Sequence, residues 1–356
     1  MASKSNSRTR SASSASTAPP AKRQKTTVAP FAASFPRRTL LSSSRWVNKV
    51  PLDIWVHQVL HPFLDLKALA TVGRCNTFFE EYWQYLLKQN VIRVPEGCPT
   101  MNQAMDLAVV FSERNKCTWE NPVQIEVGEG EHEMVGVTGG AIYDGSLTYD
   151  GCMTHVRCNS ITIVGKGKGK TTILGGFYVN GNGCSQNVKM EQLTATNTHG
   201  IGLYCQGIGT IVDVTECCFQ KCGHGGMGVV RGAIVVATRC DFMENSHLGV
   251  ACTDANTKLR LNDSTIHHNG MEGLYAEDHA VVDLHGTTTG VHSNKGDGIY
   301  AIDNAKVNIH LLSQHNTSHD NVGNNRFQQD GGSIANMNAN GTFTHAEKVE
   351  FDEGDY

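Results

Sequence analysis

The sequence predicts a mainly β protein built around a parallel β-helix, a solenoid in which each coil stacks on the one before it. A glycine followed by apolar residues recurs at intervals of 26, 21, 24 and 25 residues. These glycines are Gly202, Gly228, Gly249, Gly273 and Gly298. A second apolar column keeps the same irregular period. Two columns in step indicate one supersecondary unit stacked on itself.

The second apolar column comprises Phe219, Phe242, Ile266 and Val291, each three residues before an asparagine or, once, a cysteine. The residues that follow are Cys222, Asn245, Asn269 and Asn294. Between the columns lie short runs rich in β-branched residues, which favour strands over helices: Ile211–Val214, Lys258–Leu261, Val281–Leu284 and Val307–His310. Leucine-rich repeats have a similar repeat length and are the alternative fold, but their Leu-x-x-Leu-x-Leu motif is absent.

The β-helix is predicted to occupy residues 121–345, followed by an acidic tail at 346–356. Its first coils are the looser runs Gln124–Val127, Ile161–Val164 and Thr171–Leu174. In the preceding linker, residues 93–120, Thr100 is placed to cap a helix over Met101–Arg114. One face of that helix is apolar: Ala104, Leu107, Ala108 and Phe111. We expect this helix to close the open end of the hydrophobic bore.

Residues 1–45 form a basic tail with nine Lys/Arg and no Asp/Glu, although the whole chain has a net charge of −4. The tail is rich in Ser, Ala and Pro and is predicted to be disordered, because it has little apolar surface to bury. The run from Pro19 to Lys25 resembles a short nuclear-import signal. A plain solvated tail and an organellar transit peptide are the alternatives.

The composition favours an intracellular protein, nuclear or cytoplasmic or both. No apolar stretch reaches 18 residues, and no charged-then-apolar start marks a secretory leader, so we expect no membrane partner. The 12 cysteines are then expected to be reduced thiols. Outside the tail there are 21 basic and 34 acidic residues, so we do not expect nucleic acid as a partner.

Residues 46–92 have a different, helical character, and their residue order resembles an F-box. It has a Val-Pro-Leu start, an Ile shortly after it, a Leu-Asp-Leu core and a later aromatic pair followed by Trp83. The residues that match the docking part of that motif are Val50, Pro51, Leu52, Ile54, Leu60, Leu64, Leu66 and Leu69. The resemblance implies that they bind a Skp1-like adaptor.

The whole chain resembles F-box-only proteins that carry a right-handed parallel β-helix of the carbohydrate-binding and sugar-hydrolase, or pectin-lyase-like, type. That resemblance implies the substrate-recognition subunit of an SCF-type cullin-RING ubiquitin ligase, with an unidentified protein client on the β-helix. Such an adaptor acts by proximity. We therefore expect no enzymatic activity of its own, no catalytic residue, no cofactor and no metal.

Two residue columns are the candidate client-binding surface. Asp254, Asp278 and Asp303 each fall five residues after a repeat glycine and are expected to stack on successive coils. The tyrosines that follow an inward apolar residue are expected to point outward: Tyr204, Tyr275 and Tyr300. Aspartate is also an ordinary turn former, and the column has that simpler interpretation.

Two alternatives stay open at the level of the sequence. One is an intracellular polysaccharide lyase or hydrolase that uses Asp254, Asp278 and Asp303 as metal ligands or acid–base groups, with Arg231 or Arg260 nearby. The other is a binding scaffold attached to no ligase. A cysteine-rich stretch at 217–224 fits no zinc module and indicates apolar packing instead.

Overall fold

The structure, a computed structural model, describes residues 90–134, 153–181, 184–310 and 317–337. All of these belong to one compact unit of the chain, residues 52–356. The predicted tail at 1–45, the eight F-box-like docking residues and the acidic tail at 346–356 lie outside the described residues. Within the described part, no helix is both long and apolar enough to cross a membrane.

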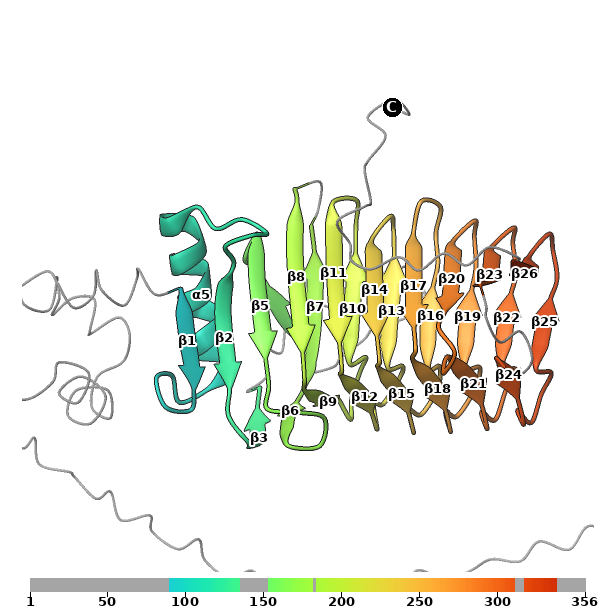
Figure 1. Cartoon of the computed structure of the whole chain (residues 1–356), viewed down its shortest axis with the longest axis horizontal. Helices are drawn as coiled ribbons and strands as arrows, with labels where there is room; N and C mark the ends of the chain where they lie inside the picture. The colour runs from blue at the N-terminus through green and yellow to red at the C-terminus, as the bar shows by residue number, and fades with distance from the viewer. Residues whose placement is uncertain (1–89, 135–152, 182–183, 311–316, 338–356) are drawn as a thin grey trace, which may run out of the picture. The chain divides into compact units, whose positions relative to one another are not determined.

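Three parallel sheets make the coil, and from β2 onward consecutive strands of the chain pass from one sheet to the next (Figure 1). The first sheet has ten strands: β1 (Val91–Val94), β2 (Val123–Val127), β5 (Ser160–Val164), β8 (Gln186–Glu191), β11 (Thr210–Thr215), β14 (Ile234–Thr238), β17 (Lys258–Asn262), β20 (Val281–His285), β23 (Lys306–His310) and β26 (Ser333–Met337).

The second and third sheets have eight strands each. The second comprises β4 (Met153–Val156), β7 (Gly176–Asn180), β10 (Leu203–Gln206), β13 (Met227–Val230), β16 (Val250–Cys252), β19 (Leu274–Ala276), β22 (Ile299–Ala301) and β25 (Arg326–Gln328). The third comprises β3 (Gly130–Glu133), β6 (Thr171–Leu174), β9 (Thr194–Thr196), β12 (Cys218–Gln220), β15 (Asp241–Met243), β18 (Thr265–His267), β21 (Gly290–His292) and β24 (Ser318–His319).

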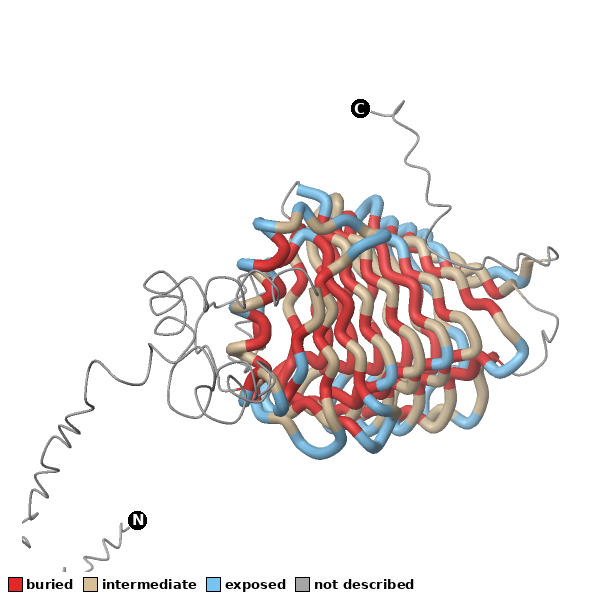
Figure 2. Tube along the Cα trace, turned by 60° about the vertical axis from the view of Figure 1, so that its left-hand side comes forward, coloured by how far each residue is buried: buried red, intermediate tan, exposed pale blue. Residues whose placement is uncertain are grey.

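The predicted apolar column forms the bore of this coil. Phe219 pairs with Phe242, Phe242 with Ile266, and Ile266 with Val291, and all four side chains are fully buried. The two phenylalanine rings stack with centroids 5.5 Å apart. Buried residues accordingly lie in rows that run from coil to coil (Figure 2). The mainly β fold and its stacked repeat are confirmed.

One repeat position was assigned wrongly from the sequence. Leu203 pairs with Met227, so the counterpart of Gly202 is Gly226, two residues before the predicted Gly228. The true intervals between repeat glycines are 24, 23, 24 and 25 residues. A Cβ on Gly226 would lie 2.8 Å from the carbonyl oxygen of Gly249 on the next coil. This close backbone approach is why the position is glycine.

The asparagines form a ladder beside the glycines: Asn245, Asn269, Asn294 and Asn321. The side-chain nitrogens of Asn245, Asn269 and Asn294 each donate to the side-chain oxygen of the next asparagine in the ladder at 2.9 Å. Each also donates to a backbone carbonyl of the preceding coil, as Asn269 does to Phe242 at 3.1 Å. The ladder therefore satisfies the amides of its buried members.

The predicted capping helix is confirmed as α5 (Met101–Asn115). The Thr100 side chain accepts a hydrogen bond from the backbone nitrogen of Gln103, which caps the first turn. Buried α5 residues join the core, and the helix packs on β1, β2 and β5. Strand β1 was not predicted. It pairs with β2, so the first sheet begins inside the segment assigned to the F-box-like domain.

Candidate functional site

One outward-facing column crosses the whole second sheet, and its members are paired from strand to strand: His155, Tyr178, Tyr204, Gly228, Ala251, Tyr275, Tyr300 and Phe327. Residues that alternate with the bore-facing ones point away from the core. The column is aromatic toward both ends of the sheet and small in the middle. Its two aromatic parts must therefore be considered separately.

Tyr275, Tyr300 and Phe327 form a continuous row of rings, which we call the aromatic strip. The ring centroids of Tyr275 and Tyr300 are 5.4 Å apart, and those of Tyr300 and Phe327 are 5.2 Å apart. All three side chains are half-buried. Because they come from β19, β22 and β25, an extended ligand lying along the coil axis would meet a ring on each of three successive coils.

Tyr204 does not extend this strip. It faces outward as expected, but it is only 5% exposed and packs with Ile201 and Val230. Its ring lies against Gly228, where an added Cβ would sit 2.9 Å from the ring carbon Cδ2. Two small residues, Gly228 and Ala251, then separate it from Tyr275. The structure thus brings together two of the three predicted tyrosines.

Carboxylates surround the aromatic strip. Burial raises the pKa of the Tyr275 hydroxyl, and the nearby charge of Glu277, which shares a side-chain hydrogen bond with it, raises that pKa further. Burial also raises the pKa of Tyr300, and the negative charges of Asp297, Asp330, Glu272 and Asp303 add to the effect. The charge of Asp303 acts on both tyrosines. The strip is therefore an acidic, partly desolvated surface.

The aspartate column lies at the turns between the second and first sheets. Asp254, Asp278 and Asp303 have φ values of 75°, 50° and 49°, in the left-handed region that aspartate tolerates better than most residues. Asp330, with a φ of 47°, continues the column. Among the described residues these carboxylates form no group with metal-binding spacing. All four occupy turn positions, and of the predicted three only Asp303 acts electrostatically on both tyrosines of the strip.

The cysteine-rich stretch is apolar packing, as expected. Burial raises the pKa of Cys218 to about 12 and that of Cys222 to about 11, so both are neutral thiols. Every described cysteine is free of a disulfide.

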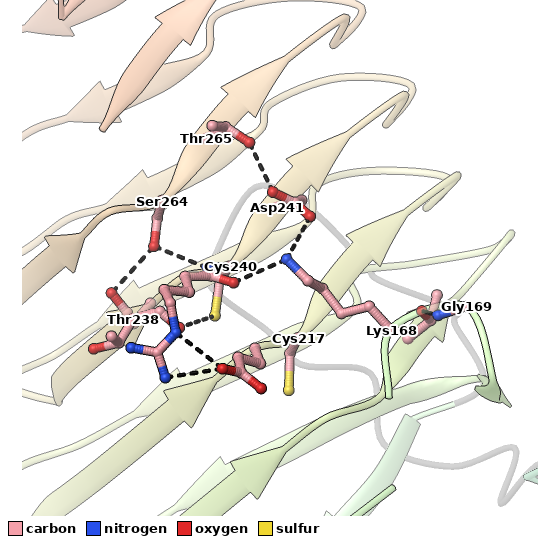
Figure 3. A network of polar contacts seen from close by, with 12 residues as sticks. Lys168, Gly169, Cys217, Thr238, Cys240, Asp241, Ser264 and Thr265 are labelled. Atoms are coloured by element: carbon pink, nitrogen blue, oxygen red, sulfur yellow. Dashed lines mark hydrogen bonds and ion pairs between the residues drawn. The ribbon is translucent and has the colours of Figure 1, made fainter. Parts of the chain in front are cut away.

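A polar network around Asp241 of the third sheet lies near Cys217 and Cys240 (Figure 3). Lys168, in the turn before β6, donates to an Asp241 carboxylate oxygen at 2.8 Å and to the Arg239 carbonyl at 3.0 Å. Thr265 donates to the other Asp241 oxygen at 2.8 Å. Burial opposes the charge of Lys168, but the bond and charge of Asp241 outweigh it and raise its pKa. The bonds of Lys168 fasten this turn to β15 and to the backbone just before it.

Comparison with known proteins supports the fold. Residues 150–289 match the family model of a right handed beta helix region. No curated protein matches the chain. Similar solved structures include ORF18 of Geobacillus virus E2, at 12% identity and a TM-score of 0.43, which covers 71% of this chain and 62% of that one.

Two further similar structures are a catalytic domain and a module of an epimerase. The Agl-KA catalytic domain has 13% identity and a TM-score of 0.38, and the match covers 70% of this chain and 48% of that one. The A-module of the Azotobacter vinelandii mannuronan C-5 epimerase AlgE6 has 13% identity and a TM-score of 0.31, with 67% and 89% covered. The chain spans less than two thirds of ORF18 and of the Agl-KA domain.

These comparisons correct one expectation. The sequence analysis expected an adaptor that is not an enzyme, whereas similar structures include a catalytic domain and an epimerase module. That expectation is withdrawn. At such low identities the likeness concerns the fold and says nothing of substrate or reaction. The Skp1-like partner, the ubiquitin-ligase role and the nuclear or cytoplasmic location stay predictions, because neither the described residues nor the comparisons test them.

Proposed function

We propose that the β-helix binds a glycan along the aromatic strip and acts on it through the carboxylates beside that strip. The observation that carries the proposal is the row of half-buried rings at Tyr275, Tyr300 and Phe327, with Glu277 bonded to the first ring's hydroxyl. Aromatic faces offer flat apolar surface, and carboxylates accept hydrogen bonds from hydroxyl groups. A sugar presents both kinds of surface.

The spacing of the rings suits a polymer. Parallel strands repeat about every 4.8 Å along the coil axis, so the strip offers equivalent contacts at regular steps. A single small molecule would use one ring, whereas a chain of sugars would use all three. We therefore assign the strip to an oligosaccharide or polysaccharide that lies parallel to the axis.

The charge of the strip restricts the sugar. Glu272, Glu277, Asp297, Asp303 and Asp330 are all acidic, and each acts electrostatically on a strip tyrosine. A polymer of uronic acids would bring like charges against them, at a cost in binding free energy. A neutral glycan or one with amino groups avoids that cost. This surface therefore favours a neutral or basic glycan over a polyuronate.

The chemistry would be general acid–base catalysis at the sugar ring. Cleavage of a glycosidic bond commonly uses two carboxyl groups, one to donate a proton and one to accept a proton or attack. Glu277 lies beside the hydroxyl of the first ring and shares a hydrogen bond with it, so we assign Glu277 the accepting role. Asp303, whose charge acts on both tyrosines, is the second carboxyl group.

A binding measurement tests the strip first. The full chain would be titrated with soluble neutral, amino and uronic glycans by affinity electrophoresis. Tyr300→Ala should weaken binding about tenfold, because a ring contact contributes roughly 0.5–1.5 kcal/mol. Tyr300→Phe is the matched control, since it keeps the ring and should bind within about threefold of the wild type. Equal binding by wild type and Tyr300→Ala would overturn the assignment.

A product assay then tests the chemistry. Glu277→Gln and Asp303→Asn keep the shape of each side chain, and asparagine also tolerates the left-handed backbone at 303. Both variants should bind the glycan yet release products at least a hundredfold more slowly. Binding without any turnover by the wild type would leave a glycan-binding module and remove the catalytic roles.

A further inference from the structure

A cluster of three ligating side chains lies on the outer face of the first sheet, apart from the strip on the second. Asp283 and His285 are two residues apart on β20 and so share a face, and His310 lies on the neighbouring β23. One ligand atom from each lies within 4.8 Å of the others. In the described part of the chain, this is the only group of His, Cys, Asp or Glu with such spacing.

The three side chains are well shielded from water. His285 is 7% exposed, and the side chains of His310 and Asp283 are 16% and 24% exposed. The imidazoles of His285 and His310 stack with centroids 4.4 Å apart. Atom Nε2 of His310 lies 3.1 Å from Oδ1 of Asp283, a separation that is also ordinary for two ligands of one metal ion.

One polar atom of this cluster lacks a partner. Atom Nδ1 of His310 is buried and makes no hydrogen bond to the described residues. Leaving a buried ring nitrogen unsatisfied costs roughly 1–3 kcal/mol. The converging donor atoms point to a missing ligand, and the orphaned nitrogen shows that the His310 ring lacks a second partner among the described residues.

We propose that Asp283, His285 and His310 bind one divalent transition-metal ion. Two imidazole nitrogens and one carboxylate oxygen suit Zn²⁺ and its late first-row neighbours, whereas Ca²⁺ and Mg²⁺ prefer all-oxygen sites. Three protein ligands leave at least one position for water or another small ligand.

Two neighbouring side chains would hold the carboxylate in place. Asn308 donates to Oδ1 of Asp283 at 3.0 Å, and a guanidinium nitrogen of Arg260 lies 3.9 Å from Oδ2. Outer partners of this kind commonly orient metal ligands. When the metal binds, it replaces the proton shared between His310 and Asp283, and the Asn308 contact can persist.

A second imidazole cluster provides an internal comparison. His267, His292 and His319 stack on successive strands of the third sheet, with centroids 5.1 and 5.0 Å apart. The rings are parallel to within 8°, and no carboxylate joins them to make a group with metal-binding spacing. We do not assign a metal to this ladder, which makes it the matched control.

The test is a calorimetric titration of the full chain, first freed of metal, with Zn²⁺ alone. We expect one ion per chain, with excess Mg²⁺ failing to compete. His310→Ala should weaken Zn²⁺ binding about a hundredfold or more, because it removes a direct ligand. His292→Ala should leave affinity and stoichiometry unchanged.

Cobalt supplies an independent readout. Co²⁺ at this site should give visible absorption bands of a low-symmetry nitrogen and oxygen site, and Asp283→Asn should weaken them while preserving side-chain shape. Circular dichroism of each variant checks that the coil is intact. No binding by a folded wild type, or loss of binding in His292→Ala alone, would overturn the proposal.

Discussion

Two columns of polar residues repeat once per coil, and they differ in burial and in hydrogen bonding. The asparagine ladder, with Asn245, Asn269 and Asn294, is buried and hydrogen-bonded from one coil to the next. The aspartate column, with Asp278 and Asp303, lies exposed at left-handed turns. The intervals between successive members are the same in both columns. A shared period therefore shows that residues stack on successive coils. Burial and hydrogen bonding show whether the stacked residues bond to one another or form turns.

The largest expected effect comes from breaking the ladder. Asn269→Ala removes the acceptor of two Asn245 groups and the donor to Phe242 and Asn294, all inside the coil. Each unsatisfied buried group costs roughly 1–3 kcal/mol, so we expect a loss of about 3 kcal/mol in unfolding free energy. Chemical denaturation measures it.

Asn262→Ala is the control for that measurement. Asn262 is half-buried on the outer face of β17 and donates one bond, to Thr238 at 3.2 Å. Its loss should cost less than about 1 kcal/mol. Equal losses in the two variants would show that the ladder adds nothing beyond ordinary surface bonds.

The aspartate column should give a smaller effect of a different kind. At Asp278, with a φ of 50°, alanine must adopt a backbone conformation that costs roughly 1–2 kcal/mol. Asp278→Ala should therefore lower the unfolding free energy by about 1 kcal/mol, whereas Asp278→Gly should change it by less than about 0.5 kcal/mol. If glycine is as damaging as alanine, the carboxylate itself matters at this turn.

The imidazole ladder should give the smallest effect, and it depends on pH. Burial lowers the pKa of His267 and His292, and neighbouring imidazoles lower both further. The unfolded chain therefore binds more protons near the ordinary histidine value of about 6.5. Stability is fully present above that pH and falls as pH decreases through it. Because these rings are partly exposed, the loss should be a few tenths of a kcal/mol.

Thermal melts between about pH 8 and 5 test this point. His292→Asn should flatten the acid side of the profile without changing stability at pH 8. A profile equally steep in wild type and variant would assign the acid sensitivity to other groups.

Much of the fold follows from local pattern. The strand runs, the Thr100 cap and the apolar face of α5 are encoded in adjacent residues, and all three are found where predicted. The error at Gly228 has a clear cause. Both Gly226 and Gly228 precede apolar residues, and only the strand register separates them. Strand β1 was missed because four residues beside a helical segment carry little signal of their own.

The candidate sites were less predictable. Tyr275 and Tyr300 lie in the same repeated sequence motif and were predicted together. Phe327 and Asp330 come 27 residues after Tyr300 and Asp303, a longer interval than the preceding ones. No repeated sequence motif marks the cluster of Asp283, His285 and His310. Residue types at outward-facing positions differ from coil to coil. The convergence of these three side chains is therefore visible only in the folded structure.

The strand register has a mechanical consequence. Each described strand pairs only with its counterparts on adjacent coils, so force applied at the end near β26 would peel the solenoid one coil at a time. The aromatic strip crosses the last three strands of the second sheet. A polymer bound to the strip would contact all three of these coils. Unfolding of the terminal coils would then also require the polymer to dissociate.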